Sequence, residues 1–177
     1  MSRYHPLLVV LHWLLAVMII LGLIMGNFVL AETPNSDPGK LFALRMHMSM
    51  GIVILFLMAV RLITRFATSK PAPAETGNAL LNKAGGWAHV GLYLLVFAMC
   101  GSGLALANLA GLPGIVFQGS GAALPVDFSD YGPRAAHGII SKLLGLLILA
   151  HVVGFVFHQV VRKDGLFSRM WFGDRQA

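Results

Sequence analysis

The sequence has 177 residues, of which 57% belong to the hydrophobic set and only 11% are charged, and its mean hydropathy is +0.77. Soluble domains carry roughly a quarter of charged residues, so this composition excludes a soluble globular protein and predicts an integral membrane protein. The 13 Lys and Arg residues against 7 Asp and Glu give a formal net charge of +6. We interpret this excess as a membrane-orientation signal and expect no nucleic-acid partner.

Four apolar runs are long enough to cross about 30 Å of hydrocarbon as helices. They cover approximately residues 7–31, 41–66, 88–109 and 135–161. We therefore predict an all-α, four-helix membrane bundle, built as a single domain from residues 1–177. The first run follows Arg3 and ends in a signal-peptide-like Val-x-Ala sequence at residues 29–31, but it is longer than the apolar region of a signal peptide, so we expect it to be retained.

The basic residues are distributed unevenly between the two sides of the membrane. Four spans place both termini on the same side. Nine of the thirteen basic residues lie on that side: Arg3, Arg61, Arg65, Lys70, Lys83, Arg162, Lys163, Arg169 and Arg175. Because Lys and Arg are enriched in cytoplasmic flanks, we predict that both termini are cytoplasmic.

The connections between the runs contain turn-forming residues. Residues 32–40 have two prolines, and residues 69–78 form a Pro-containing linker. The longest connection, residues 113–133, is rich in Gly but also contains apolar side chains, so we expect it to lie over the bundle with a short interfacial helix. The single cysteine, Cys100, lies inside the third run, which excludes a disulfide framework and a C-x-x-C-H site for covalent haem.

Three histidines lie along the fourth run, where a titratable side chain costs on the order of 2 kcal/mol or more unless it faces protein, water or a bound partner. His137, His151 and His158 are separated by fourteen and seven residues. At about 100° per residue, these steps return to within roughly 40° and 20° of the same direction. The three side chains therefore form one stripe at three depths.

Depth pairs two of these histidines with histidines of the first two runs. His12 lies near the inner end of the first run and His47 near the outer end of the second. His47 can therefore meet His137 at the outer level, while His12 meets His151 about 21 Å further in. Two opposed imidazoles suit a haem iron, which takes axial ligands on its two faces. Zinc, the rival metal, requires three or four ligands that converge on one point, and a haem-free proton or metal transporter is a further alternative.

Several segments together resemble the bacterial cytochrome b561 family. They are the pair His12 and Trp13, HMSMGIVILFLMAVRLITR at residues 47–65, AHVGLYLLVF at residues 88–97, and the spacing H-x13-H-x6-H followed by KDGLFSRM. The resemblance implies a multi-pass protein of the bacterial inner membrane with two non-covalent b-type haems. It also implies that the iron ligands match His12, His47, His137 and His151.

The same resemblance implies a redox function. A characterised member of the family oxidises superoxide at the outer side and reduces ubiquinone, and the wider superfamily includes haem subunits of hydrogenases and formate dehydrogenases. We therefore predict an oxidoreductase that transfers electrons across the membrane through two b-type haems, from superoxide or another periplasmic donor to ubiquinone. The alternative is a haem-bearing membrane anchor that passes electrons between a partner dehydrogenase, hydrogenase or cytochrome and the quinone pool.

Basic residues near the predicted haem levels are candidates for binding anions. Lys40, Arg45 and Arg134 lie near the outer pair, where cations attract an anion such as superoxide and stabilise haem propionates; they are also compatible with ordinary flanking charges. Arg61 follows His47 by fourteen residues and is predicted to lie at the inner level, beside a propionate; it is equally interpreted as an ordinary flanking cation.

Three further polar residues have two interpretations each. His158 and His89 are quinone-site candidates, because an imidazole can hydrogen-bond a carbonyl and relay a proton near neutral pH. Both are also compatible with simple positions at the membrane interface. Lys142 lies inside the fourth span, where it either extends towards the headgroups or faces the haem region.

Overall fold

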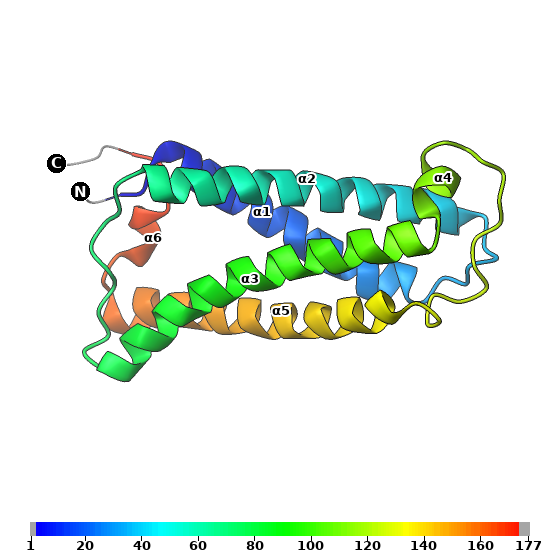
Figure 1. Cartoon of the computed structure of the whole chain (residues 1–177). Helices are drawn as coiled ribbons and strands as arrows, with labels where there is room; N and C mark the ends of the chain where they lie inside the picture. The colour runs from blue at the N-terminus through cyan, green and yellow to red at the C-terminus, as the bar shows by residue number, and fades with distance from the viewer. Residues whose placement is uncertain (1–2, 174–177) are drawn as a thin grey trace.

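The computed structural model describes residues 3–173, which form an elongated bundle of four long helices (Figure 1). α1 (Pro6–Ile24) continues into the π-helical segment η1 (Met25–Leu30), α2 spans Gly39–Ala67 and α3 spans Ala79–Leu109. α5 (Gly132–Val156) continues into a second π-helical segment, η2 (Phe157–Arg162). Two short helices, α4 (Leu112–Val116) and α6 (Leu166–Arg169), lie at opposite ends of the bundle. The predicted all-α membrane bundle is confirmed.

All four long helices are long and apolar enough to cross a membrane, and three of them agree with the predicted runs to within three residues. The exception is α3, which begins at Ala79 and not near residue 88. The Asn78 side chain accepts hydrogen bonds from the backbone N–H groups of Leu80 and Leu81 and so caps this helix. The first turns of α3 contain Asn82, Lys83 and two glycines, which lower the local hydropathy and explain why hydropathy alone placed the start too late.

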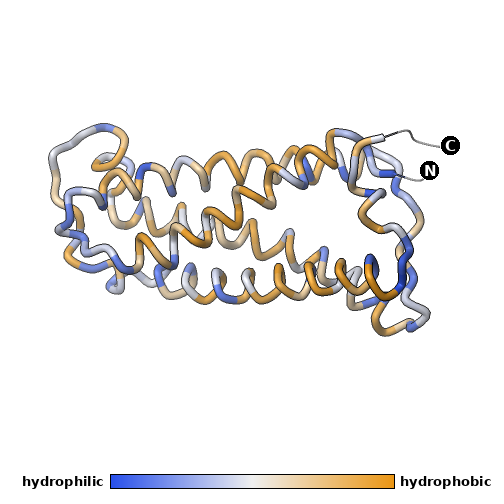
Figure 2. The backbone as a smooth tube through the Cα atoms, turned by 180° about the vertical axis from the view of Figure 1, so that it is seen from behind, coloured by the Kyte–Doolittle hydropathy of each residue, from blue (hydrophilic) through white to orange (hydrophobic). Residues whose placement is uncertain are grey.

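The helices are apolar on their outward surfaces as well as towards one another. Figure 2 shows the apolar colour along the middle of each long helix and the hydrophilic colour mainly at the two ends. Outward side chains such as Phe56 and Ile63 are 67% and 68% exposed. Such a surface suits a lipid environment, in which each helix satisfies its own backbone hydrogen bonds.

Two clusters of buried side chains hold the bundle together. The first joins α1, α2, α3 and α5 along the middle of the bundle, through Leu11, Leu15, Ile54, Met58, Val96 and Leu144. The second lies where α4 packs against α2 and α3 and contains Leu44, Ala107, Ala110, Leu112 and Val116. Within this framework α5 packs mainly against α3, and α1 packs mainly against α2.

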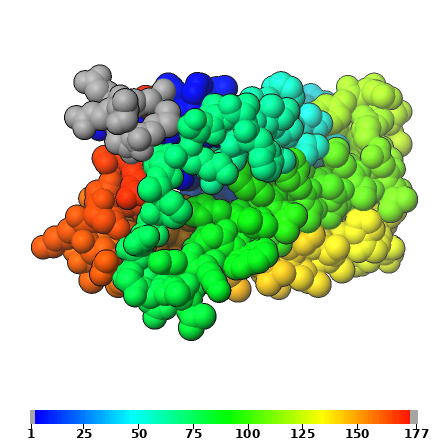
Figure 3. Space-filling model, turned by 60° about the vertical axis from the view of Figure 1, so that its left-hand side comes forward, coloured from blue at the N-terminus to red at the C-terminus, as the bar shows by residue number. Residues whose placement is uncertain are grey.

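Both termini lie at the same end of the bundle, which we call the terminal end (Figure 1). Two basic side chains attach the α2–α3 connection there: Arg169 Nη1 donates to the carbonyl of Ala72 at 2.7 Å, and Arg162 Nη2 donates to that of Glu75 at 3.5 Å. Arg3 Nη1 donates to the carbonyl of Ser168 at 3.0 Å. Figure 3 brings this end forward, with α6 and the α2–α3 connection side by side.

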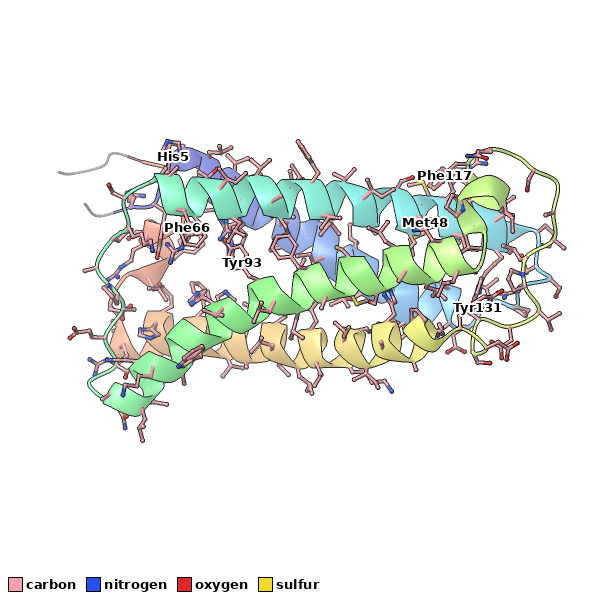
Figure 4. The ribbon with its side chains drawn as sticks, in the orientation of Figure 1. His5, Met48, Phe66, Tyr93, Phe117 and Tyr131 are labelled. Carbon is pink, nitrogen blue, oxygen red and sulfur yellow. The ribbon has the colours of Figure 1, made fainter. Side chains whose placement is uncertain are left out.

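The opposite end, which we call the α4 end, is covered by α4 and the loop that follows it. Arg45 donates through Nε and Nη2 to the carbonyl of Val116 at 3.0 and 2.7 Å, which anchors α4 to α2. Met48, Phe117 and Tyr131 gather at this end, whereas Tyr93 extends from α3 into the space between α2 and α3 further along the bundle (Figure 4). The expected short helix over the bundle is therefore α4.

Candidate functional site

His47 of α2 and His137 of α5 face each other near the α4 end. Their ring centroids lie 6.2 Å apart, with an interplanar angle of 79°. The Ser102 hydroxyl donates to the carbonyl of Met99 at 3.0 Å, so its oxygen is free to accept from His137 Nδ1, also at 3.0 Å. With its proton on Nδ1, His137 keeps the Nε2 lone pair for a metal, the arrangement common in metal-binding histidines.

His47 has no such local partner among residues 3–173, and its Nδ1 is buried without a hydrogen bond. The simple interpretation of an interior histidine satisfied by a serine therefore fits His137 better than His47. Ser141, four residues after His137 on α5, hydrogen-bonds Asn27 and no histidine among residues 3–173. The unsatisfied His47 and the oriented His137 together favour a site that accepts a bound group between them.

Three histidines meet at the second level, nearer the terminal end. The ring centroids of His12 and His151 lie 6.3 Å apart, with an interplanar angle of 73°. His89 of α3 is closer to His151, at 5.2 Å, and its Nδ1–H donates to the carbonyl of Gly85 at 2.8 Å. His89 therefore also keeps an Nε2 lone pair. Sequence analysis proposed His89 as a quinone-site candidate but did not predict its proximity to His151.

The centroid separations test whether these pairs fit a metal between two opposed imidazoles. A metal–imidazole nitrogen bond is about 2 Å long, so the centres of two imidazole rings on opposite sides of one metal should lie roughly 6 Å apart. The His47–His137 and His12–His151 pairs match this separation, at 6.2 and 6.3 Å. The His89–His151 separation of 5.2 Å is too short for opposite faces of one metal. The two predicted pairs therefore fit a haem iron better than a His89–His151 pair does.

Small residues flank the pair near the α4 end. A Cβ added to Gly103 would lie 3.1 Å from His137 Cε1, and one added to Gly26 would lie 3.4 Å from His47 Cε1. Gly51, one helical turn after His47, has nothing within 4 Å of its Cβ position. These glycines let the helices approach the histidine rings and leave space beside them, as a flat macrocycle requires.

The predicted cations occupy different surroundings. Lys40 is buried, at 3% exposed, and its ammonium donates to the carbonyls of Leu30 and Thr33, so it closes the α1–α2 connection and is poorly placed to attract an anion. Arg45 is partly engaged by α4 through the two bonds described above. Arg134 is half-buried and folds over Gly138, where an added Cβ would lie 3.3 Å from Arg134 Nη1. Arg134 therefore places a positive charge beside His137.

Arg61 lies at the level of the second pair. Its Nη1 donates at 2.7 Å to the carbonyl of Leu8, one helical turn before His12. The structure thus places the side chain at the predicted depth. Its partnership with a propionate stays a prediction.

His158 has a partner that sequence analysis did not identify. Its Nδ1 lies 2.6 Å from Oδ2 of Asp164, which follows η2, and the two side chains are 12% and 24% exposed. Lys163 between them adopts φ +54°, which turns the chain back so that Asp164 faces the helix. Although partial burial raises the pKa of Asp164, the hydrogen bond and the charge of His158 lower it, and the net direction is below the ordinary value. The pair leaves His158 Nε2 available for a ligand.

Comparison with known proteins decides between the classes that this geometry allows. Residues 3–173 match the family described as prokaryotic cytochrome b561. This chain belongs to that family. It is 25% identical over 174 residues to cytochrome b561 homolog 2 of Escherichia coli K12, covering 96% of this chain and 91% of the relative. It is 29% identical over 176 residues to cytochrome b562 of Cereibacter sphaeroides, covering 94% of each.

Family membership confirms the resemblance based on the histidine and helix motifs. The protein is a multi-pass bacterial membrane cytochrome that transfers electrons across the membrane by means of b-type haem. Its four long helices supply the spans, and the interior histidines are the natural candidates for the iron ligands.

Proposed function

We propose that this cytochrome b561 holds two b-type haems, one between His47 and His137 and one between His12 and His151, and that it oxidises superoxide and reduces ubiquinone. The observation that carries the proposal is the presence of two histidine pairs, with ring centroids 6.2 and 6.3 Å apart, on two levels of one bundle. Bound haem supplies the one-electron redox chemistry, while the protein supplies ligands, spacing and charge.

The proposal includes an orientation of the bundle. We assign the terminal end to the cytoplasm, because nine of the thirteen basic residues belong to that side by sequence. The α4 end, with the His47–His137 pair, then faces the periplasm. Superoxide formed outside the membrane would approach the α4 end, and protons for ubiquinone would come from the terminal end.

The donor reaction makes few demands on the protein. Each superoxide loses one electron and becomes dioxygen, so no proton moves at that step, and two superoxide ions supply the two electrons that one ubiquinone requires. What the protein must provide is access and a positive potential that raises the local concentration of the anion. Arg134, beside His137, is a better candidate for attracting superoxide than Lys40, which is buried and donates to backbone carbonyls.

Arg134→Gln is expected to slow superoxide-driven reduction by about threefold or more at low ionic strength, because the steering charge is lost. The difference should shrink as salt is added, since mobile ions screen exposed charges. Stopped-flow visible spectroscopy at several ionic strengths measures both effects. Lys83→Gln removes an exposed cation at the terminal end and is the matched control. Equal rates for Arg134→Gln and wild type at low salt would remove Arg134 from the proposal.

We place ubiquinone reduction near the His158–Asp164 pair. Ubiquinone takes up two protons with its two electrons, and the His158 imidazole can hydrogen-bond a quinone carbonyl through Nε2 and deliver a proton. Asp164 touches only the far nitrogen of the ring, so it is a positioning residue that fixes the tautomer and the direction of the imidazole.

His158→Ala and Asp164→Asn are both expected to slow quinone reduction, His158→Ala by about 100-fold if it relays the proton and Asp164→Asn by less. Both variants should keep the wild-type haem content, which separates a role at the quinone from a role in ligation. Stopped-flow oxidation of the pre-reduced protein at several concentrations of a ubiquinone analogue gives the rate constant of this single turnover and its dependence on quinone concentration. Glu75→Gln alters another acidic residue at the terminal end and serves as control. An unchanged rate in His158→Ala would return this histidine to an ordinary interfacial position.

Gly103→Val is expected to lower the haem content by about half, because a Cβ at this position already lies 3.1 Å from His137 Cε1, inside the contact distance of about 3.5 Å for two carbon atoms. Gly101→Val makes the same change on the same helix where nothing lies within 4 Å, so it should retain all haem. A pyridine haemochrome assay against protein concentration measures both variants. A full haem content in Gly103→Val would show that haem binding at His137 does not require a glycine at this position.

A further inference from the structure

A groove of about 450 Å³ runs between α1–η1 and α5 on the outward surface of the bundle. Its apolar walls include Ile20, Leu23 and Phe28, and Phe28 is 73% exposed. α1 packs mainly against α2, and α5 against α3, so the groove follows a seam between two helix pairs. Near the α4 end of the bundle, η1 lies beside the start of α5 (Figure 1).

The other side of the groove is polar. Asn27 and Ser141 bridge the seam there: Asn27 Nδ2 donates to the carbonyl of Leu23 at 2.8 Å and to Ser141 Oγ at 2.9 Å. Ser141 is buried, at 6% exposed. Because both amide hydrogens of Asn27 are used within the protein, these two residues offer little to a ligand. The free donor in the groove is Lys142.

Lys142 is exposed on the lipid-facing surface without a counter-charge. The only ion pair among residues 3–173 joins His158 and Asp164, so no carboxylate in that part of the chain neutralises the Lys142 ammonium. The α5–η2 helix has 31 residues, roughly 46 Å at about 1.5 Å each, which exceeds the hydrocarbon core of about 30 Å. If the helix is centred, the Lys142 backbone lies roughly 7 Å below the headgroups, within the reach of an extended lysine.

We propose that this groove binds an anionic phospholipid, with its phosphate on the Lys142 ammonium and an acyl chain along Ile20, Leu23 and Phe28. The positive charge of Lys142 favours an anionic headgroup, because an unpaired cation at this depth is costly and a lipid phosphate is the nearest available counter-ion. The apolar walls of the groove favour an acyl chain of the lipid. The lipid would fill the seam between the two helices that carry His12 and His151.

A neutral quinone is the other amphipathic molecule that this groove would admit. It would need hydrogen-bond donors for its carbonyls, whereas the donors of Asn27 are occupied and a single ammonium remains. The charge of Lys142 therefore favours the phospholipid. This inference goes beyond the proposed function and does not rest on it, because lipid retention is independent of the electron donor and acceptor.

Native mass spectrometry of the haem-loaded full chain in detergent tests the proposal. Phosphatidylglycerol is expected to bind about fivefold or more tightly than phosphatidylcholine with the same acyl chains, because phosphatidylglycerol has a net negative charge whereas the choline group of phosphatidylcholine neutralises its phosphate. Lys142→Gln should abolish this preference, whereas Lys83→Gln, at the terminal end, should keep it. Gly145→Leu fills the groove where the Cβ position has open space, and should weaken binding of both lipids. The visible haem spectrum of each variant verifies that it is folded.

Four outcomes would overturn the proposal. The first is equal binding of the two lipids to wild type, and the second is an undiminished preference in Lys142→Gln. The third is retention of a quinone that depends on Lys142 while phosphatidylglycerol does not bind, which would make the groove a quinone site. Soluble glycerol phosphate is expected not to compete, because the acyl chain contributes to binding; full competition would identify a simple phosphate site and also contradict the proposal.

Discussion

His137→Ala is expected to reduce the haem b content of the purified protein from two per chain to one. Its ring lies 6.2 Å from that of His47, and Ser102 holds it so that Nε2 is free for the iron. Loss of one axial ligand from a non-covalent haem removes much of what retains it. A pyridine haemochrome assay normalised to protein concentration measures the change.

The partner residue provides the matched test. His47→Ala should produce the same haem content and the same residual spectrum as His137→Ala, because both changes act on one site. His158→Ala alters a histidine of the same stripe and should keep both haems. Different residual spectra for His47→Ala and His137→Ala would mean that these two residues do not share one haem. Superoxide-driven reduction should fall to background in both variants if this haem is the entry point for electrons.

His151→Ala should remove the other haem and abolish quinone reduction, while the haem near the α4 end stays reducible by superoxide. The expectation follows from the 6.3 Å separation of His12 and His151, which suits ligands on opposite faces of one iron. The haem that remains in His151→Ala should therefore be the one that His137→Ala loses, so the residual spectra of the two variants should differ. Electron paramagnetic resonance of the oxidised variants resolves the two haems individually.

The third histidine at this level makes the test sharper. The ring centroids of His89 and His151 lie 5.2 Å apart, and His89 Nδ1–H donates to the Gly85 carbonyl. The Nε2 lone pair of His89 is therefore free to bind a metal. Our pairing predicts that His89→Ala retains both haems and that His12→Ala loses one. The reverse result, with haem lost in His89→Ala and kept in His12→Ala, would assign the ligand to α3 and contradict the pairing.

The depth of the histidines could be predicted from the sequence because helix rise and rotation are nearly constant. The fourteen-residue step from His137 to His151 is enough to place one near His47 and the other near His12. The rotation of α3 about its own axis has no comparable signal, since its polar positions are few. The approach of His89 to His151 therefore required the structure.

Loop geometry was beyond sequence analysis for a different reason. Lys40 and Arg45 were candidates for binding anions, but they donate to the backbone carbonyls of Leu30, Thr33 and Val116. Every residue has a backbone carbonyl, so the sequence does not indicate which one a side chain will contact. Asp164 reaches His158 because Lys163 adopts a left-handed conformation. The Lys-Asp-Gly sequence predicts a turn after a helix, but not the side chain that the turn brings into contact.

A stopped-flow visible spectrum of the purified protein, combined with a pyridine haemochrome count, tests the central claim most directly. The protein would be mixed with a pulse of superoxide and then with a ubiquinone analogue. We predict two b-type haems per chain, reduced by superoxide and reoxidised by the quinone. One haem per chain would contradict the two histidine pairs, and two haems that do not respond to superoxide would contradict the proposed donor.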